Sequence, residues 1–75
     1  MPSVENVRIT ESHLEVALKD GRQISAPLDW FPRLKSASPR DRANWEPCAA
    51  GHGIHWPAID EDLSVEGLLR GTPAA

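Results

Sequence analysis

The sequence predicts one small domain of the α+β class, and two patterns lead to this prediction. The first third of the chain alternates apolar and polar residues with a period of two, which is typical of strands that bury one face. The rest of the chain carries two serine helix-start signals, Ser38 and Ser64, on either side of a short extended segment that follows Gly51 and Gly53. We therefore expect an N-terminal three-stranded antiparallel meander, short helices in the middle, one or two further short strands and a C-terminal helix. One domain accounts for residues 1–75, with 71–75 as a frayed tail.

Turn geometry predicts the pairing of the meander. Its apolar positions are Val7 and Ile9, then Leu14, Val16 and Leu18, then Ile24, Ala26 and Leu28. Pairing Ile9 with Leu14 leaves a two-residue connection at Glu11-Ser12. A two-residue Asp20-Gly21 loop would send Ile24 to the wrong face. We therefore expect a three-residue loop, Lys19-Asp20-Gly21 with Gly21 left-handed, which places Leu18 opposite Arg22 and Val16 opposite Ile24.

Two short helices are predicted in the middle of the chain. Asp29 would cap the first helix and Pro32 would lie in its first turn, where a missing N–H costs little. The apolar residues of this helix are Trp30, Phe31 and Leu34. The run Ser38-Pro39-Arg40-Asp41 combines a serine cap, a proline at the first helical position and an acid three residues after the cap. This second helix should end near Trp45.

The C-terminal part is predicted to be extended and then helical. From Trp45 the chain is extended, and Pro47 limits this segment to an edge or irregular strand because proline cannot donate to a β-ladder. Residues 54–56 should form a short strand after a glycine-containing reversal. Ser64 would cap the closing helix, and Gly71-Thr72-Pro73 would end it. The expected buried face of that helix consists of Val65, Leu68 and Leu69.

Composition and charge narrow the classes of function. The net charge of −3 argues against direct nucleic-acid binding, which needs clustered Lys and Arg. We interpret the basic residues Arg33, Lys35, Arg40 and Arg42 as solvated helix faces, with a small anion- or partner-binding patch as the alternative. No run approaches the roughly 20 apolar residues that span a bilayer, and Met1–Glu5 lacks the features of a signal peptide. We expect a cytoplasmic protein without membrane contact.

His52 and His55 are the candidates for metal binding. On a helix this spacing would present both imidazoles to one metal, but the flanking glycines and a nearby proline disfavour a helix. On a strand the same spacing sends the side chains to opposite faces. A bulge at Gly53, with Asp60 or Asp62 as a further ligand, would be needed to complete a site. We therefore expect no cofactor, and a histidine that is hydrogen-bonded to backbone or carboxylate near the acidic residues.

Cys48 is the only cysteine, so an internal disulfide and a cysteine-rich zinc site are excluded. It has no obvious activating neighbour. We expect a structural role, and a Cys–His dyad with His52 or His55 is the weaker alternative.

Asp60-Glu61-Asp62 places three adjacent carboxylates just before the closing helix. Negative charge near a helix N-terminus is stabilising by roughly 0.3–1 kcal/mol, and mutual repulsion favours an exposed turn. The functional alternative is a surface that docks on a basic partner and steers its association. Acid–base catalysis would need a pocket that separates the pKa values of two carboxyl groups, and so short a chain offers little cover for one.

Three tryptophans and Phe31 are the only aromatic residues. Our main interpretation is that they form the core, because truncating a buried tryptophan costs about 3–5 kcal/mol, comparable with the stability of a small domain. Trp30 and Phe31 are adjacent, and adjacent residues of a helix cannot both face one core. One of them is therefore a candidate contact residue beside Arg33, since tryptophan and arginine are enriched in binding hot spots.

Several runs of the chain resemble a small bacterial family. These runs are Pro27–Leu34, Arg42–Glu46, Gly53–Pro57 and Asp60–Leu69, and the Asp20-Gly21 hairpin also fits. Over nearly its whole length the chain is similar to the family catalogued as domain of unknown function 2442. The resemblance implies an α+β fold with an N-terminal antiparallel sheet and brings no established catalytic residues. The segment Pro47–Ala50 departs from the family, where a more aliphatic strand is expected.

The resemblance also implies two biological settings. Some relatives carry the domain beside a helix-turn-helix DNA-binding module. Others are encoded next to a second small family, in a pairing that looks like a toxin–antitoxin arrangement. These 75 residues include no helix-turn-helix, so we expect no direct binding to DNA.

We therefore expect a noncatalytic protein-interaction module, the antitoxin-like or regulatory half of a two-protein bacterial system. Its partner would be another, more basic protein or a second copy of the chain. Its candidate contact residues are Trp30, Phe31, Arg33, Asp60, Glu61 and Asp62. Two alternatives stay open: a small metal-binding protein or enzyme that uses His52, His55 and Asp60, and a DNA-linked transcriptional regulator that acts with a partner.

Overall fold

The computed structural model describes residues 3–71, which form two three-stranded antiparallel sheets and several short helices, so the predicted α+β class is confirmed. The first sheet has the order β1-β2-β3, with β1 at Val4–Ile9, β2 at His13–Leu18 and β3 at Gln23–Pro27. The second has the order β4-β5-β6, with β4 at Glu46–Cys48, β5 at Gly53–Trp56 and β6 at Glu61–Ser64.

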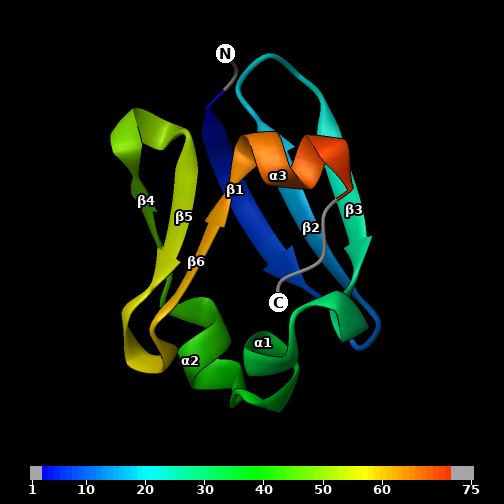
Figure 1. The fold of residues 1–75 in the computed structure, drawn as a ribbon, viewed down its shortest axis with the longest axis vertical. Coiled ribbons are helices and arrows are strands. Elements are labelled where there is room, and N and C mark those ends of the chain that lie inside the picture. The colour runs from blue at the N-terminus through cyan, green and yellow to red at the C-terminus, as the bar shows by residue number, and fades with distance from the viewer. Residues whose placement is uncertain (1–2, 72–75) are drawn as a thin grey trace.

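Short helices connect and cover the sheets. The α-helices are α1 at Pro32–Ser36, α2 at Pro39–Ala43 and α3 at Val65–Arg70, and the single 3-10 turns are η1 at Leu28–Trp30, η2 at Ala49–Gly51 and η3 at Pro57–Ile59. Figure 1 shows α3 crossing one face of the first sheet, with α1 and α2 together at the lower end of the molecule. No helix in the described part of the chain is both long and apolar enough to cross a membrane.

Both predicted hairpin registers of the first sheet are confirmed. Ile9 pairs with Leu14, and Val16 pairs with Ile24. The backbone N–H of Leu18 donates to the carbonyl of Arg22 at 2.8 Å, so these residues close the second hairpin. Gly21 has a φ of 94°, as the three-residue loop requires.

One hydrophobic core joins the two sheets and the helices. Its completely buried side chains are Leu14, Val16, Phe31, Leu34, Ile54, Trp56 and Val65. Trp56 is the largest of these, while Trp30 and Trp45 are half-buried and pack against the cluster. The core interpretation of the aromatic residues therefore holds fully for Trp56 and Phe31 and partly for the other two.

The first predicted helix begins later than expected. Leu28 is buried, but it lies in η1 and not in the third strand, and Asp29 makes no capping hydrogen bond. Instead α1 starts at Pro32, because the ring of a proline suits the first helical position and Phe31 turns inward just before it. The second helix is capped as predicted, since the N–H of Asp41 donates to Ser38 Oγ at 3.1 Å, and it ends at Ala43.

The second sheet contains a strand that the sequence analysis assigned to an acidic turn. Only Asp60 is a turn residue, with a φ of 52°. Glu61 and Asp62 already belong to β6 and pair with Trp56 and His55 of β5. The structure therefore has three further strands, not the one or two expected, because η3 and the left-handed Asp60 reverse the chain and Glu61 and Asp62 re-enter the sheet. The predicted extended segment at Pro47 is confirmed as the edge strand β4.

The closing helix α3 is capped and ended as predicted within the described residues. The N–H of Gly67 donates to Ser64 Oγ at 2.9 Å, and Gly71 is left-handed with a φ of 74°. Val65 and Leu68 are buried, but Leu69 is 43% exposed and does not share their face as expected. Thr72-Pro73 and the predicted frayed tail beyond Gly71 lie outside the described residues.

The turn η2 between β4 and β5 stores backbone strain. Ala49, Ala50 and Gly51 are consecutive and all have positive φ, at 50°, 57° and 86°. For an L-residue with a Cβ, the left-handed region costs roughly 1–2 kcal/mol. Two alanines are therefore held in an unfavourable conformation by the closing bond of this loop, in which the N–H of His52 donates to the carbonyl of Ala49 at 3.1 Å.

Replacing Ala50 by glycine should raise the free energy of unfolding by about 1 kcal/mol, because glycine adopts positive φ without a Cβ clash. Urea denaturation followed by tryptophan fluorescence measures the change. Ala58→Gly in η3 is the matched control and should lower stability, since Ala58 is not among the residues with positive φ. A less stable Ala50→Gly variant would contradict the strain.

Candidate functional site

Arg33 and Asp60 bring together the two segments that carry the predicted contact residues. Arg33 lies in α1, and its Nη1 donates to the backbone carbonyl of Asp60 at 2.6 Å across 27 positions of sequence. The bond uses a backbone oxygen, and Asp60 is exposed, so its carboxylate is available to solvent. We call this meeting of α1 with the turn before β6 the Arg33–Asp60 junction.

Phe31 and Glu61 lack the exposure that a contact residue needs. Phe31 is 0% exposed, because it is the inward member of the Trp30-Phe31 pair. Glu61 is 9% exposed, and its Oε1 accepts the N–H of Asp62 at 3.1 Å. Phe31 and Glu61 were predicted to contact a partner, but both are buried, so their roles are structural.

Trp30 is the outward member of the aromatic pair, yet it is half-buried. It packs against the core, and a Cβ placed on Gly71 would lie 3.9 Å from its ring. The side chain thus lies beside the end of α3. Its remaining exposed surface keeps Trp30 among the candidate contact residues, together with Arg33, Asp60 and Asp62.

His55 and Asp62 form a cross-strand pair on the second sheet. They are opposite each other on β5 and β6, and His55 Nδ1 lies 2.7 Å from Asp62 Oδ1. Because a carboxylate accepts, Nδ1 of His55 is the donor. The expectation of a histidine hydrogen-bonded to a carboxylate near the acidic residues is confirmed.

The other groups of the metal or catalytic alternative do not join this pair. His52 is exposed in the turn after η2, whereas Asp60 lies in the turn before β6. Across residues 3–71, no cluster of three or more His, Cys, Asp or Glu side chains is placed to hold a metal ion. His52, His55 and Asp60 are thus distributed over separate parts of the second sheet and its turns.

Arg42 holds the two middle helices together. Its Nε donates to the carbonyl of Leu34 at 2.9 Å and its Nη2 donates to the carbonyl of Lys35 at 2.8 Å. These carbonyls belong to the last residues of α1, where a cation also complements the helix dipole. Arg42 is therefore structural, and of the predicted solvated basic residues Arg33 and Lys35 are also engaged, by Asp60 and Asp29.

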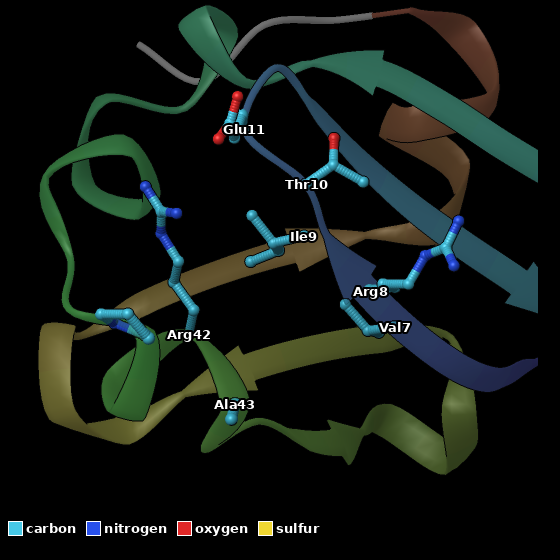
Figure 2. Close-up of a pocket in the computed structure, with 8 residues that line it drawn as sticks. Val7, Arg8, Ile9, Thr10, Glu11, Arg42 and Ala43 are labelled. Carbon is cyan, nitrogen blue, oxygen red and sulfur yellow. The ribbon is translucent and has the colours of Figure 1, made fainter.

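A groove between β1 and α2 is a feature that the sequence analysis missed. It has a volume of about 650 Å³ and is lined by residues 7–11 and by Pro39, Arg42 and Ala43 of α2. Figure 2 shows Ile9 pointing toward Arg42, while the guanidinium of Arg8 points away from it. Period-two alternation indicated which face of β1 is apolar, but no local pattern indicates that α2 returns beside it. We call this feature the β1 groove.

The two sheets, the short helices and the β1 groove define a small two-sheet α+β domain. The chain belongs to the family described as protein of unknown function (DUF2442), whose model matches residues 4–74. The predicted resemblance is therefore confirmed. No curated protein matches this chain.

Two solved structures share this fold. A crystal structure of a protein of unknown function from Rhodospirillum rubrum is 27% identical, with a TM-score of 0.82, and the match covers 100% of this chain and 93% of that one. A solution NMR structure of an uncharacterised protein from Chromobacterium violaceum is 23% identical, with a TM-score of 0.80 over 97% of this chain and 69% of that one. The second likeness concerns the fold alone.

Arg42→Met should lower the free energy of unfolding by about 2 kcal/mol, because it removes two charge-assisted hydrogen bonds to α1. Urea denaturation gives the value, and amide exchange should accelerate in α1. Arg40→Met on the exposed face of α2 is the matched control and should change stability by less than about 0.5 kcal/mol. Equal effects of the two substitutions would contradict the bridging role.

The pair of Asp29 and Lys35 should make stability depend on pH. A hydrogen bond from Lys35, aided by its charge, lowers the pKa of Asp29 below the ordinary 3.8. A lowered folded-state pKa stabilises the fold above the unfolded value, and that stabilisation is lost as the pH falls below 3.8. Asp29→Asn should therefore lose less stability than the parent between neutral and strongly acidic pH, measured by urea denaturation.

Lys35→Met tests the same pair from the other partner, because it removes the cation and leaves the carboxyl group of Asp29. It should flatten the pH dependence in the same range as Asp29→Asn. An unchanged pH profile in either variant would show that the pair does not lower the pKa of Asp29 in solution.

Proposed function

We propose that this domain is a noncatalytic protein-interaction module, the antitoxin-like or regulatory half of a two-protein bacterial system that acts in the cytoplasm. The observation that supports this most is the Arg33–Asp60 junction. It unites two segments that are distant in sequence into one exposed surface of mixed charge. The partner is a more basic protein that contacts the free carboxylate of Asp60.

The use of the polar side chains supports a binding role over a catalytic one. His55 is held by Asp62, Arg42 by two carbonyls of α1, and Arg33 by the carbonyl of Asp60. Each of these groups stabilises the fold, and its hydrogen-bonding partner is already supplied. What the junction offers to another molecule is its shape and the charge of Asp60 and Asp62.

The size of the domain also fits this role. Each side of a standard protein interface buries about 800 Å². The accessible surface of this domain is 4549 Å², so one partner of ordinary size would cover roughly a sixth of it. Binding on that scale would add substantially to the stability of a domain whose own core is small.

Coexpression with the products of the adjacent genes tests the proposal. A tagged full-length chain should copurify with one of them as a complex of defined mass, measured by size exclusion with light scattering. Asp60→Asn should weaken that complex about 3- to 10-fold at low salt, because it removes the steering charge while asparagine tolerates the left-handed backbone.

Asp20→Asn is the matched control, since Asp20 lies in the β2–β3 turn at the opposite end of the molecule in Figure 1. It should leave the affinity of the complex unchanged. A chain that stays monomeric and binds no adjacent gene product would contradict the proposed function, and equal effects of the two substitutions would remove the junction from the interface.

A further inference from the structure

The turn between β2 and β3 holds the Asp-Gly pair of this sequence, Asp20-Gly21, whereas the other four aspartates and both asparagines precede larger residues. Glycine has no Cβ to hinder ring closure, so an aspartate before glycine isomerises more readily than one before any other residue. We propose that Asp20 is a site of spontaneous isoaspartate formation, and that Arg22 slows this reaction in the folded chain by holding the carboxylate of Asp20. This inference is independent of the proposed function.

The reaction rearranges the link between Asp20 and Gly21. The backbone nitrogen of Gly21 attacks Cγ of the carboxylic acid, whose hydroxyl leaves with the nitrogen's proton as water, and a cyclic succinimide forms. Water from the solvent then adds to the main-chain carbonyl of the ring and breaks the bond from that carbon to the nitrogen. The chain now continues through Cβ and Cγ of Asp20, and the former main-chain carbonyl has become a carboxylate.

The folded turn engages both groups that must react. Oδ1 of Asp20 accepts the backbone N–H of Arg22 at 3.0 Å, and Oδ2 accepts Nε of the same arginine at 2.7 Å. The N–H of Gly21 donates to the carbonyl of Leu18 at 3.0 Å. Ring closure requires the carboxyl group to leave Arg22 and the nitrogen to lose its proton. The reaction therefore depends on local opening of the turn.

The protonation state of Asp20 acts in the same direction. A carboxylic acid loses an oxygen as water far more readily than a carboxylate does. The backbone N–H of Arg22 lowers the pKa of Asp20 below the ordinary 3.8, and the guanidinium of Arg22 adds to this effect. At neutral pH the folded chain therefore contains less of the reactive acid form of Asp20 than an unfolded chain does.

Isomerisation of this exposed turn would reach the core. The new linkage adds Cβ of Asp20 to the main chain and so changes the length of the loop. Pairing of Val16 with Ile24 depends on a three-residue loop with Gly21 at a φ of 94°. The same strand β3 carries Ala26, which is 4% exposed, so a shifted β3 would move a core residue.

Peptide mapping of the full chain measures the reaction. After incubation at neutral pH, cleavage at Glu15 and Glu46 releases residues 16–46, which contain Asp20 and no other glutamate before the last residue. Chromatography separates the aspartate and isoaspartate forms, and an isoaspartate-specific methyltransferase identifies the second. Isoaspartate should accumulate at Asp20 when guanidinium chloride unfolds the chain, and much more slowly when the chain is folded.

Arg22→Met removes the side-chain bond and keeps the backbone N–H. It should accelerate isomerisation of the folded chain about two- to fivefold, the range that an exposed ion pair supports. Arg22→Lys keeps the charge and should recover part of the protection. Arg8→Met is the matched control, because it breaks an exposed pair with Glu15 on the same sheet, and it should leave the rate unchanged.

Asp20→Asn gives a second readout through the same succinimide, because its amide leaves as ammonia and the mass of the chain rises. This variant should also react faster when unfolded than when folded. It should therefore be freshly purified when it is compared with Asp60→Asn in partner binding.

Three results would overturn the inference. A lack of isoaspartate at Asp20 in the unfolded chain would reject the site, and equal rates in the folded and unfolded chains would reject protection by the turn. Equal rates in Arg22→Met and Arg8→Met, or an acceleration in Arg22→Met that only follows a loss of global stability in urea denaturation, would reject the role of Arg22.

Discussion

The contact between Trp56 and Arg42 is the interaction on which the arrangement of the molecule depends. The buried indole of Trp56 donates from Nε1 to the carbonyl of Arg42 at 3.0 Å, which ties β5 to the end of α2. The side chain of Arg42 then bonds the carbonyls of Leu34 and Lys35 and so ties α2 to α1. An indole N–H buried without an acceptor costs about 1–3 kcal/mol, so the second sheet dictates where α2 lies. The positions of Arg33 and of the β1 groove both follow from this, because α1 carries Arg33 and α2 forms a wall of the groove.

Most charged pairs of this domain are exposed and local, and they add little to stability. Arg8 with Glu15, Arg22 with Asp20 and Arg70 with Glu66 are of this kind. Exposed pairs of this type contribute roughly 0–1 kcal/mol each. Stability therefore rests on a core made from a few large side chains, as expected for a chain of 75 residues. Exposed charged groups of such a domain can therefore contact a partner, because the stability of the fold depends little on them.

The Arg33–Asp60 junction and the β1 groove differ in what they offer. The junction binds its own arginine through a backbone carbonyl and leaves a carboxylate free, so its contribution to a partner is electrostatic. The β1 groove is lined by apolar side chains of β1 and α2 beside Arg42 and Glu11, so what it offers is largely apolar surface. Membership of a family of unknown function leaves the role of the junction as a proposal.

The sequence by itself determined the features that depend on neighbouring residues. Period-two alternation and loop parity were enough for the first sheet and both of its registers, and Ser38 and Ser64 were enough for two helix starts. Tertiary structure decided what depends on distant residues. In the folded domain, Glu61 is buried in β6, and Phe31 is fully buried whereas Trp30 is only half-buried. Arg33 bonds to Asp60, and α2 lies beside β1. A strand repeat or a cap is specified by a few adjacent side chains, whereas a groove or junction depends on how a shared core fixes segments that are tens of residues apart.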